Sequence, residues 1–434
     1  MAGIGLTTGV LAVLLPILGL LALAWLVVGP RKHLALAVPV SFGAGLLVGF
    51  GAKFLIDDVI NPWGAPLDWR IYFFVGVAVT AISLVVPKML RNKRWFVRAL
   101  APLAGLLVVL AVALQINQVF GYYPTLGSLW GDNGVRIETV TTPPPDQGGQ
   151  LTAQTPTVKL SDWNPPADMP ANGKVIKMAI PSTVSGVPSG DNFVYLPPAY
   201  LVAKPANVPV LVLIHGNPGG SQDWLTGGRI AQALDAYAAA NKGIAPLVVM
   251  PDVSAQSAAN WPMCMDSKLG KGGTFLAVDV PNFVRETFKL GLGSAQQFAI
   301  GGFSFGGTCA FQMGVTFPQA YPTFIDVSGE RGPTIAGGDP AIIKTYFGGD
   351  AAAFAKVNPL DVLKTTKLPT SKGIIVVGGN DSAYRPQGEE VYRALKAAGA
   401  QVTLQTLPGG HTWSVWKPGV VNNLDWLMQQ YGVR

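Results

Sequence analysis

Charged side chains are scarce in this sequence of 434 residues. They make up 13% of it, whereas soluble proteins average about 25%. The cations are also unevenly placed, because residues 1–120 hold nine Lys and Arg against three Asp and Glu, and the rest of the chain is nearly neutral. A wholly water-soluble protein is therefore not expected, and the charge balance gives the remainder no basis for binding nucleic acid.

Histidine and cysteine are scarcer still, with three and two residues in the whole chain. No group of His, Cys and carboxylates has the spacing of a metal site, so we predict neither a metal nor a cofactor. Cys264 and Cys309 are a candidate disulfide if they lie outside the cytoplasm, and two buried thiols are the alternative.

Long uncharged apolar runs, by contrast, are plentiful near the N-terminus. Four of them cover residues 4–28, 34–52, 71–87 and 99–120. Each approaches the roughly 20 residues that a helix needs to cross about 30 Å of hydrocarbon. The first lacks the basic start of a signal peptide and is longer than its usual apolar core. We therefore interpret residues 1–120 as a four-span transmembrane anchor.

The loops between these runs predict the orientation of the anchor. Arg31, Lys32 and His33 follow the first run, and a second basic cluster follows the third, whereas the middle loop is acidic. The second cluster comprises Lys88, Arg91, Lys93, Arg94 and Arg98, and the acidic residues are Asp57, Asp58 and Asp68. The positive-inside rule places both basic loops in the cytoplasm. We thus predict a multi-pass protein of the cell membrane whose chain after residue 120 is extracytoplasmic.

Composition divides the remaining chain into two parts. We interpret residues 121–172 as an extracytoplasmic linker, a stalk or a strap over the next domain, because much of it is rich in Pro, Thr, Gln and Gly and cannot build a core. In residues 173–434, short apolar runs alternate with helical patterns. This alternation predicts an α/β fold with a doubly wound, mostly parallel sheet.

A glycine-rich stretch at residues 301–307 follows one predicted strand and precedes a predicted helix. Within it, Gly302-x-Ser304-x-Gly306 fits the nucleophile elbow of α/β-hydrolases. The serine of such an elbow sits on a sharp turn, where a flanking side chain would collide with the strand or the helix. An incidental serine in a glycine-rich turn is the alternative.

A serine hydroxyl needs a base to take its proton. His33 lies in a predicted cytoplasmic loop and cannot reach Ser304. His411 comes just after the last predicted strand, where the base of this fold stands, so we predict it as the general base. His215 ends a buried predicted strand, and we expect it to orient the loop that follows.

The base in turn needs an acid that fixes its tautomer. Asp381 comes directly after residues 373–380, a run that begins with a predicted strand at 373–377, and so lies at the edge of the sheet where catalytic groups gather. The order Ser304, Asp381, His411 is the one expected of α/β-hydrolases. Asp326 and Glu330, after the preceding strand, are competing candidates.

Two loops supply the remaining predicted site. We expect the backbone N–H groups of Phe305 and Asn217 to form the oxyanion hole. Residues 215–220 read HGNPGG, and because no Gly-Lys-Ser/Thr follows, a phosphate-binding loop is disfavoured. Candidates for the substrate pocket are His215, Trp224 and Trp413, with Trp261 and Trp416 nearby in the sequence, and core packing is the alternative for all of these tryptophans.

Four runs carry a resemblance to a known family. They are VYLPPAY at 194–200, HGNPG at 215–219, GFSFGG at 302–307 and GHTW at 410–413. With these runs, residues 173–434 resemble the esterase D-like group of α/β-hydrolases, which includes the mycobacterial mycolyltransferases. The resemblance implies hydrolysis of carboxylic esters, or acyl transfer, on lipids or sugars of the cell envelope. The mycolyltransferases differ in using a glutamate as the acid and in lacking such an anchor.

Three functions follow as hypotheses. The leading one is a membrane-anchored extracytoplasmic serine esterase that cleaves a lipid or glycolipid ester through an acyl-enzyme. The second is an acyltransferase that uses the same site but passes the acyl group to a sugar or lipid hydroxyl. The third is a non-catalytic binding module on a hydrolase fold.

Overall fold

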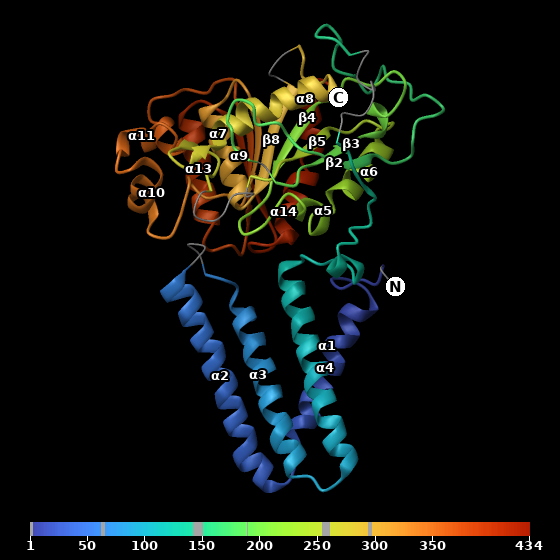
Figure 1. Cartoon of the computed structure of the whole chain (residues 1–434), viewed down its shortest axis with the longest axis vertical. Coiled ribbons are helices and arrows are strands. Elements are labelled where there is room, and N and C mark those ends of the chain that lie inside the picture. The colour runs from blue at the N-terminus through green and yellow to red at the C-terminus, as the bar shows by residue number, and fades with distance from the viewer. Residues whose placement is uncertain (1–2, 62–65, 142–150, 189, 254–260, 294–296) are drawn as a thin grey trace. The chain divides into compact units, whose positions relative to one another are not determined.

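The computed structural model describes residues 3–61, 66–141, 151–188, 190–253, 261–293 and 297–434 (Figure 1). The chain divides into two compact units, Met1–Asp132 and Asn133–Arg434. The triple proline at 143–145 in the predicted linker lies outside the described residues.

The first unit is all-helical. Its elements are α1 (Val10–Val27), η1 (His33–Ala37), α2 (Val38–Lys53), η2 (Phe54–Ile60), α3 (Trp69–Leu90), α4 (Trp95–Phe120) and the short 3₁₀ helix η3 (Gly127–Trp130). Four helical segments, Val10–Val27, His33–Ile60, Trp69–Leu90 and Trp95–Phe120, are long and apolar enough to cross a membrane. The predicted all-α region with four candidate spans is thereby confirmed.

The second span runs further than the sequence predicts. It continues through η2 to Ile60 and so carries Lys53 and Asp57, although we expected it to end at residue 52. The two side chains are one helical turn apart and form an ion pair of 3.6 Å. The Tyr72 hydroxyl from α3 donates to the Asp57 carboxylate at 2.5 Å. These contacts pair Lys53 with Asp57 and bring a hydroxyl donor to the Asp57 carboxylate.

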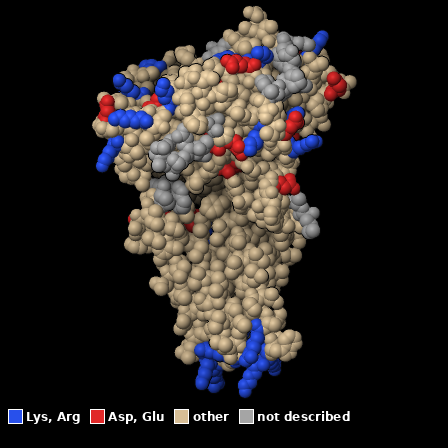
Figure 2. Space-filling model, viewed as in Figure 1, with Lys and Arg blue, Asp and Glu red and all other residues tan. Residues whose placement is uncertain are grey.

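The outer surfaces of these helices are apolar. Large exposed hydrophobic side chains occur throughout them, for example Leu21, Leu47 and Leu103, whereas Val184 is the only one among the described residues of the second unit. In the space-filling view, an uncharged band covers the helices and Lys and Arg gather at one end (Figure 2). Such surfaces are typical of helices solvated by lipid.

Small residues bring α2 and α3 into close contact. A side chain at Gly45 would come within 2.4 Å of the Gly76 carbonyl oxygen, and one at Gly49 within 2.9 Å of the Tyr72 carbonyl oxygen. The Gly45-x-x-x-Gly49 pattern therefore serves packing between two helices of the same chain.

The second unit is built on a nine-stranded sheet with the order β1-β2-β3-β5-β4-β8-β9-β10-β11. The strands are β1 (Ile137–Thr139), β2 (Lys174–Lys177), β3 (Phe193–Leu196), β4 (Val210–Ile214), β5 (Leu247–Met250), β8 (Phe298–Phe303), β9 (Thr323–Val327), β10 (Lys372–Gly378) and β11 (Gln401–Leu407). Only the pairs of β3 with β2 and with β5 are antiparallel. The hairpin of β6 (Asp266–Ser267) and β7 (Gly270–Lys271) stands apart. The predicted mostly parallel sheet is confirmed.

Helices cover both faces of the sheet (Figure 1). They are α5 (Asp223–Thr226), α6 (Ile230–Ala240), α7 (Gly272–Thr274), α8 (Val280–Phe288), α9 (Phe305–Thr316), α10 (Gly338–Phe347), α11 (Ala351–Ala355), α12 (Pro359–Val362), α13 (Arg385–Ala397), α14 (Trp413–Val421) and α15 (Leu424–Gln430), with η4 (Pro198–Tyr200) and η5 (Phe275–Asp279). On β9, Asp326 faces Gly307 of α9, whereas the next residue, Val327, faces Gly419 of α14. Because side chains alternate along a strand, α9 and α14 lie on opposite faces.

Much of the predicted linker belongs to this unit. Strand β1 pairs in parallel with β2, and Val140 N–H donates to the Lys177 carbonyl oxygen. Leu151 is buried in the core cluster, and Leu160 N–H donates to the Val433 carbonyl oxygen at 2.8 Å. The described part of residues 151–172 is therefore a strap over the sheet domain and not a free stalk, and the unit begins near residue 133 instead of 173.

Candidate active site

Ser304 stands on the turn between β8 and α9. Its φ of +54° lies in the left-handed region, and its N–H donates to the Val327 carbonyl oxygen at 2.8 Å. A Cβ at Gly302 would lie 2.3 Å from the Gly306 carbonyl oxygen, and one at Gly306 would lie 2.2 Å from that of Ile214. The glycines on both sides are thus required by close backbone approach, which holds the serine in its unusual conformation.

The structure brings Ser304, His411 and Asp381 together from three separate loops. The Ser304 hydroxyl is 2.8 Å from His411 Nε2, so it can donate its proton to the imidazole. His411 Nδ1 is 2.9 Å from Asp381 Oδ2. Asp381 is 6% exposed and Ser304 is 7% exposed, whereas 26% of the His411 side chain is open to solvent. This is the geometry expected of a nucleophile, a base and an acid that orients the base.

The contacts that hold His411 in place are not evident from spacing along the chain. The Tyr384 ring stacks on the imidazole with centroids 3.8 Å apart and planes 16° apart. The Tyr384 N–H also donates to Asp381 Oδ1 at 3.0 Å. On another side, Trp416 meets the imidazole edge-on at 5.0 Å. Base and acid are therefore fixed by aromatic and backbone contacts that spacing along the chain does not reveal.

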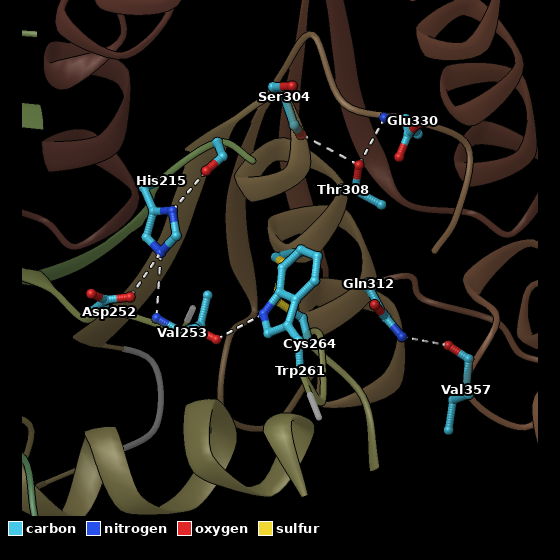
Figure 3. Close-up of a disulfide and its surroundings, with 12 residues drawn as sticks. His215, Asp252, Val253, Trp261, Cys264, Ser304, Thr308, Gln312, Glu330 and Val357 are labelled. Carbon is cyan, nitrogen blue, oxygen red and sulfur yellow. Dashed lines mark hydrogen bonds and ion pairs between the residues drawn. A yellow bond between two sulfur atoms is a disulfide. The ribbon is translucent and has the colours of Figure 1, made fainter. Parts of the chain in front are cut away.

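The two competing carboxylates, Asp326 and Glu330, make other contacts. Asp326 is fully buried in β9, where it accepts the Gly329 N–H at 2.9 Å, and burial raises its pKa to about 7. Burial also raises the pKa of Glu330 to about 7, and its backbone N–H donates to the Thr308 hydroxyl (Figure 3). The partner of His411 Nδ1 is instead Asp381.

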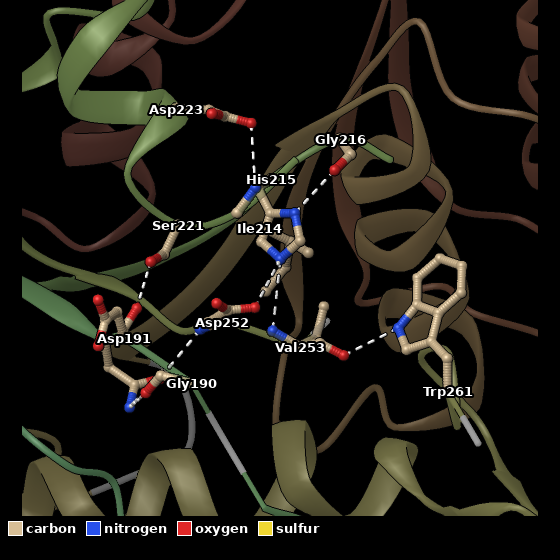
Figure 4. A network of polar contacts seen from close by, with 12 residues as sticks. Gly190, Asp191, Ile214, His215, Gly216, Ser221, Asp223, Asp252, Val253 and Trp261 are labelled. Carbon is tan, nitrogen blue, oxygen red and sulfur yellow. Dashed lines mark hydrogen bonds and ion pairs between the residues drawn. The ribbon is translucent and has the colours of Figure 1, made fainter. Parts of the chain in front are cut away.

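The two expected oxyanion donors are placed by different elements. Phe305 is the first residue of α9, so its N–H is among those that no helical carbonyl can accept. Asn217 is exposed in the loop after β4. His215, fully buried, holds that loop because its Nδ1–H donates to the Gly216 carbonyl oxygen at 2.7 Å (Figure 4). That His215 orients the loop stays a prediction, and this contact is the one it requires.

The expected substrate-pocket residues are core residues. His215 and Trp224 are 0% exposed, and Trp413 is 5% exposed. Trp224 donates its indole N–H to the Ile214 carbonyl oxygen at 3.1 Å, and both tryptophans pack against Phe303 beneath the elbow. We therefore correct the prediction that these three side chains line the pocket, because all three are buried and the tryptophan rings pack in the core.

Cys264 and Cys309 are joined by a disulfide with Cα atoms 5.5 Å apart. Cys309 lies on α9, one turn beyond Phe305, and Cys264 lies in the segment that follows Trp261 (Figure 3). In the described parts of the chain, no three His, Cys, Asp or Glu side chains are grouped so that they could hold a metal ion.

Sheet order, elbow and the contacts of His411 together define a serine hydrolase of the α/β-hydrolase fold. The chain belongs to the esterase family, whose sequence model matches residues 191–427.

Known relatives agree with this assignment. The chain is 31% identical over 390 residues to an uncharacterized protein of Corynebacterium glutamicum, covering 88% of this chain and 87% of that protein. It is 25% identical over 237 residues to an acetyl esterase of Caldicellulosiruptor saccharolyticus, covering 51% of this chain and 84% of that enzyme. A solved ferulic acid esterase matches with a TM-score of 0.50 and 19% identity, covering 61% of this chain and all of that one, which shows the fold alone.

Proposed function

We propose that this protein is a membrane-anchored, extracytoplasmic serine esterase that hydrolyses a carboxylic ester of a lipid or of another cell-envelope component. The observation that carries the proposal is the hydrogen-bonded chain from Ser304 Oγ through His411 to Asp381. Ser304, His411 and Asp381 then act as a catalytic triad.

The proposed reaction follows from the geometry. Ser304 Oγ attacks the ester carbonyl carbon while His411 Nε2 takes the hydroxyl proton. Asp381 stabilises the imidazolium through its contact with Nδ1. The Phe305 and Asn217 N–H groups stabilise the oxyanion, and the tetrahedral intermediate collapses as His411 returns the proton to the leaving alcohol. His411 then deprotonates a water molecule that attacks the acyl-enzyme carbonyl, and it returns this proton to Ser304 Oγ as the acyl–oxygen bond breaks and the carboxylic acid leaves.

Charge and aromatic residues support the proposed placement in the membrane. The loop after α1 and the loop between α3 and α4 are basic, whereas Asp57, Asp58 and Asp68 lie at the opposite ends of α2 and α3. Exposed tryptophans stand near helix ends, namely Trp69, Trp95 and Trp130. Tryptophans favour the membrane interface, and basic loops favour the cytoplasm. With both basic loops in the cytoplasm, the N-terminus lies outside. Four spans then return the chain after α4 to the same, outer side.

The lipid or envelope ester is supported by the anchor, because a tethered enzyme meets substrates in or near the membrane. The acetyl esterase relative is itself an ester hydrolase by name. Nothing in the contacts of Ser304 separates hydrolysis from transfer, since both pass through the same acyl-enzyme and differ in which hydroxyl enters next.

The test uses the full chain purified in detergent. A fluorophosphonate probe is expected to label the wild type stoichiometrically and to leave Ser304→Ala unlabelled. An unlabelled wild type would overturn the proposed esterase and favour a binding module. With a labelled lipid ester, free fatty acid as the main product supports hydrolysis, whereas acyl transfer to an added sugar supports the acyltransferase.

A further inference from the structure

We propose that Trp261, fixed by the Cys264–Cys309 disulfide, is a positioning residue that connects the two sides of the oxyanion hole. The inference rests on the proposed function, because it concerns how the Phe305 and Asn217 N–H groups are held. Among the described residues, no hydrogen bond or ring contact joins Trp261 to Ser304, His411 or Asp381, so its expected effect differs from theirs.

The first connection is to the side of the hole formed by α9. The Trp261 ring packs on the Phe305 ring with centroids 4.6 Å apart and planes at 51°. Phe305 supplies the backbone N–H next to the nucleophile. Its side chain is buried, and the indole is one of the surfaces that keep it in place.

The second connection runs to the loop after β4. The Trp261 indole N–H donates to the Val253 carbonyl oxygen at 2.8 Å, and Val253 N–H faces His215 Nε2 at 3.4 Å. His215 Nδ1–H donates to the Gly216 carbonyl oxygen at 2.7 Å, and the Asp252 carboxylate also lies 3.4 Å from Nε2. Figure 4 shows this path from Trp261 to Gly216, which directly precedes Asn217.

The disulfide closes the arrangement. Cys309 is four residues after Phe305 on α9, so both side chains lie on the same face of the helix. Cys264 is three residues after Trp261, and both cysteines are 1% exposed. The covalent bond therefore ties the segment that carries Trp261 to the helix that carries Phe305. An extracytoplasmic site would keep this bond oxidised.

If Trp261 has this role, its loss should affect only the stabilisation of the oxyanion. Loss of Trp261 or of the disulfide would misplace the donors but leave His411 and Asp381 unchanged. Turnover would therefore fall, while KM and the pH midpoint of kcat/KM would stay the same. Removal of one oxyanion donor outright lowers kcat by about 10²–10³, so displacement of a donor is expected to cost about tenfold or more.

The experiment compares four variants of the full chain in detergent. Trp261→Leu removes the ring and the indole N–H, Trp261→Phe retains a ring against Phe305, and the double variant Cys264→Ala/Cys309→Ala removes the bond without leaving a free thiol. Trp163→Leu is the matched control, because the Trp163 indole also donates to a backbone carbonyl, that of Lys242, but lies in the strap. Active sites are counted with the fluorophosphonate probe, and kcat and KM are measured with p-nitrophenyl acetate.

We expect kcat per labelled site to fall about tenfold or more in Trp261→Leu and in the double cysteine variant, and less in Trp261→Phe. Affinity for a trifluoromethyl ketone, which binds as an oxyanion, should fall in parallel, and Trp163→Leu should match the wild type. Unchanged kcat in Trp261→Phe and in the double cysteine variant would overturn the positioning role even if Trp261→Leu failed to fold. A wild type that takes no label would instead overturn the esterase itself.

Discussion

Replacement of Asp381 tests whether His411 must be oriented by an acid in order to act as the base. Asp381 Oδ2 accepts from His411 Nδ1, and its Oδ1 accepts from Tyr384 N–H. Asp381→Asn retains the shape but favours the wrong tautomer of His411, so kcat is expected to fall about 10⁴-fold. The fall in kcat is measured as the rate of ester hydrolysis per active site, with active sites counted by the fluorophosphonate probe.

Asp350→Asn, which retains a helix-capping side chain at the start of α11, is the control. A loss below tenfold would contradict the assignment and point to Glu330.

Asp326 gives the molecule a pH-dependent stability. Its pKa is raised from 3.8 to about 7 by burial, so the folded state keeps a proton that the unfolded state releases. Its contribution to the free energy of unfolding is therefore full below pH 3.8 and is lost as the pH rises through 7. Asp326→Asn keeps an acceptor for Gly329 and cannot ionise.

We therefore expect the free energy of unfolding of Asp326→Asn to exceed that of the wild type by about 1–3 kcal/mol at pH 8, which is the usual cost of an unsatisfied buried polar group. At pH 4 the two free energies should match. Thermal unfolding in detergent at the two pH values measures the difference. An equal offset at both values would show that ionisation of Asp326 is not its cause.

Among the elements, α2 and α3 depend on one close crossing. A Cβ at Gly45 would lie 2.1 Å from the Thr80 hydroxyl and 2.4 Å from the Gly76 carbonyl oxygen, whereas one at Gly43 meets nothing within 4 Å. Gly45→Ala should therefore lower the unfolding temperature of the full chain, and Gly43→Ala should leave it unchanged or slightly higher. Equal unfolding temperatures for the two variants would contradict the close packing described here.

Local rules made some elements predictable. The elbow at Ser304 was recognisable because its glycines are required by steric contacts within a few residues of the chain. The order of Ser304, Asp381 and His411 along the chain follows from the fold. The break between α5 and α6 at residues 227–229 was not predictable from local rules. The Gly227 backbone there packs against the Trp413 indole, which is distant in the sequence. The contacts of Tyr384 with His411 and of Trp261 with Phe305 are likewise tertiary, and no spacing encodes them.

For the whole molecule, the proposed topology can be tested by thiol labelling. The two native cysteines are joined and buried, so they give no background. Lys93 lies in the basic loop between α3 and α4, and Lys204 is exposed in the second unit. An impermeant maleimide is expected to label Lys204→Cys in intact cells and Lys93→Cys only after lysis. The reverse pattern would place the esterase unit in the cytoplasm.

The edge strand β1 has a practical consequence for anyone who wishes to produce the enzyme without its helices. A truncated gene product starting at residue 173 would lose β1, which pairs with β2, and the strap residues that cover the core. It would also lose Asn133, whose side chain accepts a hydrogen bond from Thr226. The bare edge of β2 would then promote aggregation, so the cut belongs before Asn133, where the second unit begins.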